Sequence, residues 1–286
     1  MATVEIAPIK PPPRPGRVRT SAVSRLYGTA RDGLEETGAM VRLAGKTIVS
    51  AVTPPYCYGI EFVQQFSFTL RACWIPLLIS TVAFGYEAPG LQGANVLTLL
   101  GAIDRLGGFF VLASIREFAP FVTAVVLAGV AGTAITADLG ARRIREELDA
   151  LEVLGVDPVK NLVVPRFLAL MLMTGLFDIF ALIFGIVGGI VATVVNHAPL
   201  GPFFATLANN AETTDLWASV LKTTLFGAII AIVCCYKGMT ARGGAEGVGR
   251  AVNQAVVISF LGIFAFNYVF TQVLLATHPD ITTIAK

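Results

Sequence analysis

The feature that most constrains this chain is a series of apolar runs, each long enough to cross a lipid bilayer. A helix needs about 20 predominantly apolar residues to span the hydrocarbon core, and several segments of the 286-residue sequence meet that requirement. Only 14% of the residues are charged and 55% are hydrophobic, whereas soluble domains carry about 25% charged residues. The short alternating segments of a membrane β-barrel are missing. The sequence therefore predicts an all-α integral membrane protein.

Five transmembrane helices are predicted behind an N-terminal amphipathic helix. Residues 24–53 alternate apolar and charged side chains at helical spacing, a pattern typical of a helix that lies in the membrane interface, and Pro54-Pro55 ends it. The predicted spans cover residues 72–100, 107–137, 167–195, 216–236 and 251–276. Whether residues 91–100 continue a broken first helix or begin another one is left open by the sequence.

Both ends of the chain are predicted to lie outside the membrane domain. Residues 1–23 are basic and proline-rich and lack the apolar core of a signal peptide, which predicts a disordered cytoplasmic tail. Residues 24–277 are assigned to the membrane domain. Residues 278–286 form a short tail on the other side of the membrane.

The distribution of lysine and arginine predicts the orientation. With the N-terminus in the cytoplasm, the segment up to Arg71 carries nine basic residues, 138–166 carries five and 237–250 carries three, which makes 17 of the 21 in the chain. Basic residues concentrate on the cytoplasmic side of membrane proteins. The sequence therefore predicts a multi-pass protein of the inner (plasma) membrane with a cytoplasmic N-terminus and an extracytoplasmic C-terminus.

The cytoplasmic connection at 137–166 is predicted to contain a short amphipathic helix over about 142–155. Its apolar face consists of Ile144, Leu148, Leu151 and Gly155. Gly155 ends this helix, and Asp157-Pro158 combines an N-cap with a first-turn proline, so a second helix begins there. A charged helix fixed between two spans can transmit force from a soluble partner. On the pattern alone, the alternative is a solvated helix that merely connects the spans.

Arg116 and Glu117 are predicted near the outer membrane boundary, because residues 118–137 cross about 30 Å as a helix. Ionisable residues at that depth usually face a cavity or a partner. One interpretation is that Arg116 binds a lipid phosphate or carboxylate while Glu117 holds the guanidinium in place. The alternative is a structural ion pair at a helix end.

The remaining polar and small residues predict packing rather than chemistry. Asp178 is expected to make a helix–helix hydrogen bond, with a lipid or proton role as the lesser alternative. Small residues permit close helix packing at Ala128/Gly132, Gly129/Thr133 and Gly185/Gly189. The four cysteines lack the spacing of a zinc or redox motif, and no catalytic residue, metal or cofactor is predicted.

A phosphate-binding loop is excluded by spacing. The segment GAMVRLAGKT at 38–47 resembles such a loop, but six residues separate Gly38 from Gly45 where four are required. Any ATP hydrolysis that drives this protein must therefore come from a partner.

The segment ADLGARRIREELDALEVLGVDP, followed by LVVPR, resembles the signature of the MlaE/YrbE permease family. Residues 116–140 resemble the helix that precedes this signature, and the likeness extends over roughly residues 35–277. The resemblance implies the permease subunit of an ABC-type lipid transporter, built as a dimer. It also implies that a short coupling helix docks on a cytoplasmic ATPase subunit. The residues expected to make that contact are Arg145, Glu146, Glu147, Asp149, Ala150 and Leu151.

The same resemblance implies further partners. The double glutamate Glu146-Glu147 and the long basic tail favour the Mce-associated branch, where two different permease subunits pair, so a homodimer and a heterodimer both stay open. Extracytoplasmic MCE-domain proteins and membrane lipids are expected partners, and nucleic acid is not. The expected substrate is a phospholipid, fatty acid or sterol that moves between the inner membrane and an MCE-protein conduit. The alternatives are a scaffold that anchors an MCE assembly and a lipid-modifying membrane enzyme.

Overall fold

The computed structural model describes residues 22–54, 56 and 58–278. Most of the predicted N-terminal tail, residues 1–21, and residues 279–286 of the C-terminal tail lie outside the described residues. The chain divides into two compact units, Met1–Val41 and Arg42–Lys286. The second unit holds all the spans and the candidate sites described below.

The predicted amphipathic helix is present as α1, Ala22–Val52, which crosses from the first unit into the second. Large apolar side chains are exposed along it at helical spacing: Leu34, Val41, Ile48, Val49 and Val52. An exposed apolar stripe on a helix with a charged opposite face is the pattern of an interfacial helix.

Five helical segments of the described chain are long and apolar enough to cross a membrane. They are Gly59–Leu99, Ile103–Ile144, Val159–Val195, Thr213–Met239 and Gly244–Thr277. The prediction of an all-α integral membrane protein with five spans is therefore confirmed. The first segment begins 13 residues earlier than the predicted residue 72, because the aromatic and polar residues before Arg71 also satisfy their backbone groups within the helix.

The first segment is one interrupted helix, which answers the question left open for residues 91–100. It consists of α2 (Gly59–Gly85), a π-helical stretch η1 (Tyr86–Gln92) and α3 (Gly93–Leu99). The interruption contains Pro89, which has no N–H to continue the regular hydrogen-bond ladder.

The second segment is interrupted in the same way. It runs through η2 (Ile103–Arg105), α4 (Leu106–Phe110), η3 (Val111–Phe118), α5 (Ala119–Leu127), η4 (Ala128–Gly132) and α6 (Thr133–Ile144). The rest of the chain forms α7 (Glu147–Val153), η5 (Val159–Val163), α8 (Val164–Val195), α9 (Leu200–Asn210), α10 (Thr213–Met239) and α11 (Gly244–Thr277). The helix α9 was not predicted from the sequence.

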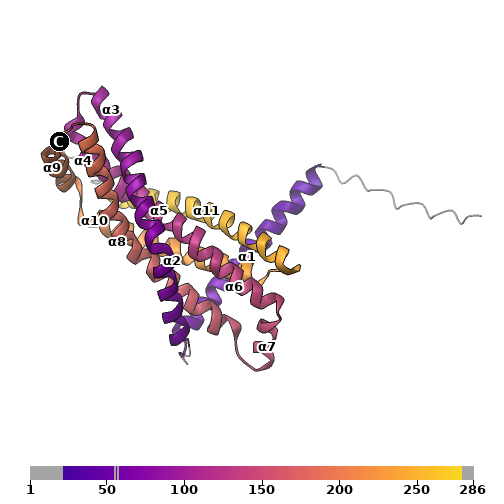
Figure 1. Ribbon diagram of the computed structural model, residues 1–286. Coiled ribbons are helices and arrows are strands. Elements are labelled where there is room, and N and C mark those ends of the chain that lie inside the picture. Colours follow the sequence, from indigo (N-terminus) through magenta and orange to yellow (C-terminus); the bar gives the residue numbers. More distant parts are fainter. Residues whose placement is uncertain (1–21, 55, 57, 279–286) are drawn as a thin grey trace, which may run out of the picture. The chain divides into compact units, whose positions relative to one another are not determined.

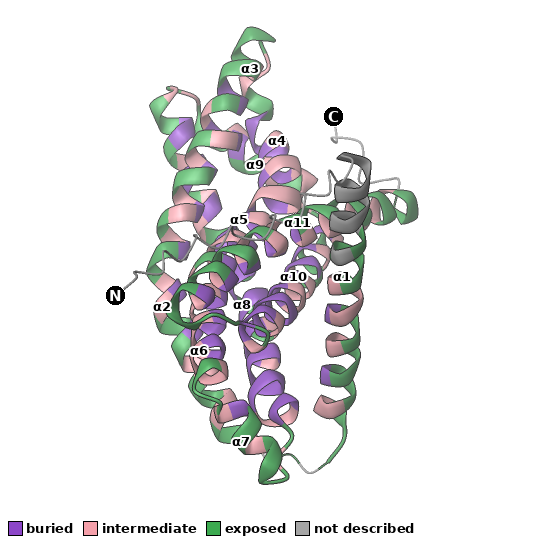
Figure 2. Ribbon diagram, turned by 90° about the vertical axis from the view of Figure 1, so that its right-hand side faces the viewer, coloured by how far each residue is buried: buried purple, intermediate pink, exposed green. Residues whose placement is uncertain are grey.

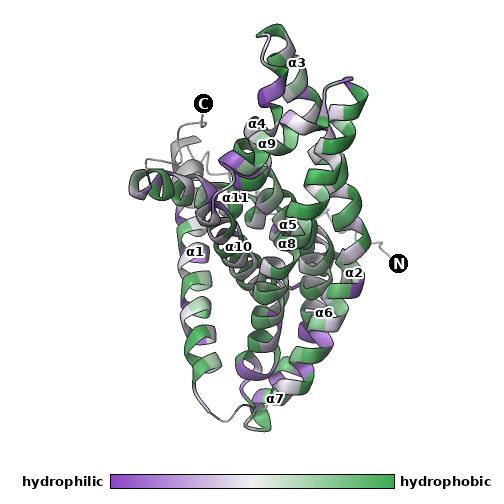
Figure 3. Cartoon of the chain, turned by 90° about the vertical axis from the view of Figure 1, so that its left-hand side faces the viewer, coloured by the Kyte–Doolittle hydropathy of each residue, from purple (hydrophilic) through white to green (hydrophobic). Residues whose placement is uncertain are grey.

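The buried residues gather on the inner faces of the second, third and fourth spans, and the first and fifth spans are the more exposed ones (Figure 2). The exposed faces of the spans are largely hydrophobic (Figure 3), as expected of helices in contact with lipid. Glycines allow α2 and α8 to touch through their backbones: a Cβ at Gly188 would meet the carbonyl oxygen of Val82 and the amide of Tyr86. The predicted close packing is confirmed at Gly132 and Gly189, but a Cβ at Gly129 would meet nothing within 4 Å.

The membrane unit has two distinct ends. Figure 1 shows α7 at one end and α3, α4 and α9 at the other; we call these the α7 end and the α9 end. Within α10, Asp215 lies 22 residues before Lys237, which corresponds to about 33 Å along a helix. Arg116 and Asp138 are also 22 residues apart. Charged side chains thus occupy two levels separated by about one hydrocarbon thickness.

Candidate functional site

A buried ion pair joins the second and fourth spans at the α9 end. Arg116 Nε donates to Asp215 Oδ1 at 2.7 Å, and Arg116 Nη2 donates to Asp215 Oδ2 at 3.2 Å. The Arg116 side chain is 13% exposed and that of Asp215 1%. Asp215 also accepts the backbone N–H of Glu212 at 3.2 Å, at the start of α10. This bidentate, charge-assisted contact fixes both the guanidinium and the start of α10.

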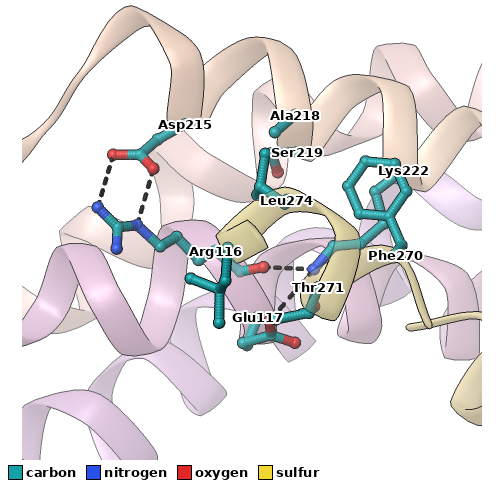
Figure 4. Close-up of a pocket in the computed structure, with 10 residues that line it drawn as sticks. Arg116, Glu117, Asp215, Ala218, Ser219, Lys222, Phe270, Thr271 and Leu274 are labelled. Atoms are coloured by element: carbon teal, nitrogen blue, oxygen red, sulfur yellow. Dashed lines mark hydrogen bonds and ion pairs between the residues drawn. The ribbon is translucent and has the colours of Figure 1, made fainter. Parts of the chain in front are cut away.

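Glu117 binds a different set of partners, so the expectation that it holds the Arg116 guanidinium is wrong. Its carboxylate accepts hydrogen bonds from Asn267 Nδ2 at 2.8 Å and Thr271 Oγ1 at 2.9 Å, both on α11. Lys222 Nζ lies 3.5 Å from the same carboxylate and also donates to the carbonyl oxygen of Arg116. Adjacent residues of a helix point in different directions, and Figure 4 shows the two side chains turned apart.

These groups line a small, partly open pocket between η3, α10 and α11. The charged lining consists of Arg116, Glu117, Asp215 and Lys222. The apolar part consists of Ala218, Phe270, Leu274 and Leu275. Lys222 Nζ also lies 6.0 Å from the centre of the Phe270 ring, at the edge of cation–π distance. Two cations and two carboxylates thus balance beside an apolar wall, an arrangement suited to an amphiphilic ligand.

Asp178 lies directly behind this pocket. Ser219, which lines the pocket, donates from Oγ to Asp178 Oδ2 at 2.7 Å, and Asp178 is fully buried. This contact between α8 and α10 confirms the predicted helix–helix hydrogen bond. The second oxygen, Oδ1, accepts no hydrogen bond from the residues that the structure describes. The sequence predicts Asp178 within a span, but its closeness to the Arg116 region depends on how α8 packs on α10.

The predicted coupling helix is shorter than expected. The helix α6 runs on to Ile144, Glu146 adopts a left-handed backbone with φ 60°, and α7 begins at Glu147. The expected continuous helix over 142–155 is therefore wrong, because the chain turns at Glu146 before α7 starts. Gly155 has φ 76°, and the Asp157 side chain accepts the N–H of Val159 at 2.9 Å. The predicted stop and the predicted second helix are thus confirmed.

Most of the residues predicted to contact the ATPase lie on the surface around α7. Arg145, Glu146, Asp149 and Ala150 are exposed, while Glu147 and Leu151 are half-buried. Leu148 alone of the predicted apolar face is buried. Two exposed apolar residues that were not predicted to belong to it, Val153 at 89% and Leu154 at 76%, extend this surface. The only feature of the sequence that could have indicated their exposure is their position directly after the charged residues of this segment. We call residues 145–154 the α7 surface.

A second charged cluster connects three spans near the α7 surface, around one buried arginine. Arg166 of α8 is 1% exposed and binds Asp138 of α6 at 2.7 Å and Glu61 of α2 at 3.2 Å through Nη2. Its Nη1 donates to the carbonyl oxygen of Leu162 at 2.7 Å. Arg166 thus holds α2, α6 and α8 together at this end of the bundle. In the sequence, Arg166 stands out only as the last residue of the LVVPR segment. Nothing in the sequence indicated that Glu61 would bind it.

The end of α1 is tied to the segment after α7. Lys46 Nζ lies 3.1 Å from Asp157 Oδ2, and Lys160 Nζ donates to the carbonyl oxygen of Thr53 at 3.0 Å. Both lysines are largely wet, so each contact contributes little energy. They do place the second half of α1 beside the coupling segment.

Comparison with known proteins gives consistent matches. The family model described as Permease MlaE matches residues 62–273. A probable ABC transporter permease protein of Synechocystis sp. is 41% identical over 180 residues, which cover 62% of this chain and 68% of that protein. A similar protein of Rickettsia prowazekii is 29% identical over 225 residues, 78% of this chain and 86% of that protein.

A plant protein is also similar. The chloroplast protein Trigalactosyldiacylglycerol 1 of Arabidopsis thaliana is 35% identical over 214 residues, 71% of this chain and 57% of that protein. The chain thus matches less than two thirds of the plant protein's length. The family model covers nearly all of the five spans and, apart from Glu61, both charged clusters. The chain therefore belongs to the MlaE family of ABC transporter permeases.

Proposed function

We propose that this chain is the permease subunit of an ABC-type lipid transporter, and that the pocket beside Arg116 receives the lipid head group. The observation that carries this proposal is the combination of balanced charges and an apolar wall in one pocket between η3, α10 and α11. Lipids present the same two chemistries within a few ångströms of each other. The name of the plant relative contains that of a lipid, trigalactosyldiacylglycerol, which supports the same substrate class.

The pocket is small and partly open, so it would hold part of a head group and not a whole lipid. The acyl chains or ring system would lie outward along Phe270 and Leu274. Because the pocket contains two cations and two carboxylates, a dipolar head group such as that of a zwitterionic phospholipid fits better than a strongly anionic one. Phospholipid, fatty acid and sterol remain the substrate classes of the proposal.

ATP hydrolysis by a separate cytoplasmic subunit would act through the α7 surface. Exposed Val153 and Leu154 offer apolar contact area, and Glu146 and Asp149 flank it with negative charge. Arg166 would then pass the movement to three spans at once. This places the α7 end in the cytoplasm, in agreement with the distribution of basic residues.

The transporter would contain further subunits. A second permease subunit, identical or different, would complete the dimer, and extracytoplasmic MCE-domain proteins would accept or deliver lipid near the α9 end. These partners follow from the family resemblance of the 137–166 segment. The inner membrane is the proposed location.

Filling the pocket without changing its charge tests the proposal. Ala218→Trp introduces bulk into the pocket from α10, and we expect the lipid that co-purifies with the complex to fall at least about tenfold, a loss equivalent to roughly 1.4 kcal/mol. Leu221→Trp, at an exposed position of the same helix, is the matched control and should leave bound lipid unchanged. Lipid is measured by mass spectrometry of the purified complex. Equal lipid content in both variants would contradict the proposed site and favour a scaffold.

A further inference from the structure

One exposed face of α2 carries polar side chains along a span that is otherwise apolar on its surface. Gln64, Ser67, Phe68 and Arg71 follow one another at spacings that place them on the same side of a helix. We call these four residues the α2 polar face. Together with Val63 and Ala72 they line an open groove with about 910 Å³ of empty space.

Arg71 lies deep within the membrane region. Glu61 of the same helix binds Arg166, which binds Asp138, so Glu61 belongs to the charged level at the α7 end. Arg71 is ten residues further along α2, or about 15 Å. The two charged levels are about 33 Å apart, so Arg71 lies near the middle. The sequence predicted the first span to begin just after Arg71, whereas the helix itself begins at Gly59.

An arginine at this depth needs a partner. Among the residues that the structure describes, none forms a hydrogen bond or an ion pair with the exposed Arg71 guanidinium. Gln64 likewise has no partner there. Lipid tails cannot accept hydrogen bonds, and an unsatisfied charge at the bilayer centre is costly. The α2 polar face is therefore incomplete in the isolated chain.

The chemistry of the face specifies what completes it. A carboxylate is the strongest match for a guanidinium, and side-chain amides and hydroxyls hydrogen-bond across packed transmembrane helices. Phosphate groups of bilayer lipids lie near the charged levels, about 15 Å away along the helix. Another helix can supply a carboxylate at mid-membrane, and small Ser67 and Ala72 allow it to approach closely.

The partner helix belongs to a different protein chain. In the described part of this chain, the acidic residues of the spans lie at or beyond the charged levels, except for Asp178, which is fully buried. A second copy therefore offers no exposed carboxylate at the depth of Arg71. We propose that the α2 polar face binds a transmembrane helix of another subunit, whose aspartate or glutamate pairs with Arg71 at mid-membrane.

Site-specific photocrosslinking in intact cells identifies the occupant. A benzoylphenylalanine probe replaces Phe68, and the same probe at Val257, an exposed residue of α11, is the control. The expected adduct at position 68 is a peptide from the transmembrane helix of another chain that contains an aspartate or glutamate. The Val257 probe should not capture that peptide.

Charge reversal then tests the pairing. Arg71→Glu should lower co-purification of the crosslinked partner chain about five- to thirtyfold. Replacing the partner's acidic residue by arginine in the same cells should restore co-purification. Arg71→Gln should leave the thermal midpoint of the isolated chain unchanged, because no intramolecular partner is lost. In the crosslinking experiment, the proposal is overturned by an adduct with lipid or with this same chain, by no protein adduct, or by a captured helix without a carboxylate. Capture of the same peptide at Val257 also overturns it. In the charge-reversal experiment, failure to restore co-purification overturns it.

Discussion

At the scale of single residues, the α9 end is held by two interleaved ion pairs rather than one. Arg116 binds Asp215 on α10, and Glu117 binds Lys222 on the same helix. Because α10 contributes one charge of each sign, the second and fourth spans are tied at two successive points. The pocket opens between these ties and α11, so its charged lining is also part of what holds the helices in place.

Two substitutions distinguish lipid binding from structural support at this site. Arg116→Ala leaves the buried Asp215 carboxylate without its guanidinium, and breaking a buried pair in this way costs about 3–5 kcal/mol. Arg116→Ala/Asp215→Asn removes both charges and should recover most of that stability. If Arg116 contacts the head group, bound lipid stays low in both variants. Lipid content that follows thermal stability would instead make the pair a structural clamp only. Thermal unfolding and lipid mass spectrometry give the two readouts.

The sequence singled out Arg116 but not its partner, for a physical reason. An arginine beside a predicted membrane boundary is costly, so its importance can be read from hydropathy alone. The carboxylate that binds it lies 99 residues away in the chain, and only the packing of η3 on α10 brings the two together. The neighbouring Glu117 was the obvious candidate and was wrong, since successive helical residues point to different sides.

At the scale of elements, backbone contact between helices sets the packing of the first and third spans. Gly85 and Gly188 lie where α2 and α8 approach without side chains between them. This closeness suits a membrane, where packing rather than the hydrophobic effect drives helix association.

Adding a methyl group at this contact should be far more harmful than adding one elsewhere. Gly188→Ala places a Cβ against the backbone of Val82 and Tyr86, which cannot yield as a side chain can, and overpacking of this kind costs about 1–3 kcal/mol. Gly129→Ala meets nothing within 4 Å and should change stability by less than about 0.5 kcal/mol. Thermal unfolding of the detergent-purified protein measures both. Similar midpoints for the two variants would rule out this contact as a determinant of packing.

Hydropathy predicted the number of spans because every backbone group in lipid must bond within its own helix. It did not predict where the helices themselves begin and end, because polar residues such as Gln64 and Arg71 extend α2 without interrupting its hydrogen bonds. The π-helical stretches and the left-handed turn at Glu146 leave no periodic signal. They arise from tertiary packing and from local strain.

At the scale of the whole molecule, the two charged clusters lie at opposite ends of the bundle, one behind the α7 surface and one around the pocket. The α7 end holds Arg166, Asp138 and Glu61, and the α9 end holds Arg116 and Asp215. The helix α10 is continuous between the two levels and packs against α6. A force on α7 therefore has a packed route to the pocket.

The proposed orientation can be tested by labelling. In a background with Cys57 replaced by serine, we expect Arg145→Cys and Glu246→Cys to be protected from a membrane-impermeant thiol reagent in intact cells. Glu212→Cys, at the α9 end, should react. Cys73, Cys234 and Cys235 are buried and give a low background. Labelling of positions 145 and 246 without labelling of 212 would invert the topology and remove the basis for the α7 surface.

ATP-driven lipid movement by the reconstituted transporter is the most direct measurement of the central claim. Proteoliposomes containing the full complex should move labelled lipid only when ATP is hydrolysed. The Glu146→Lys/Asp149→Lys variant should insert and unfold normally, because exposed charges usually change stability by less than about 0.5 kcal/mol, yet lose most of this transport. Glu246→Lys, an exposed charge reversal away from α7, is the control and should transport normally. ATP hydrolysis without lipid movement in the wild type, or undiminished transport in the α7 variant, would contradict the account.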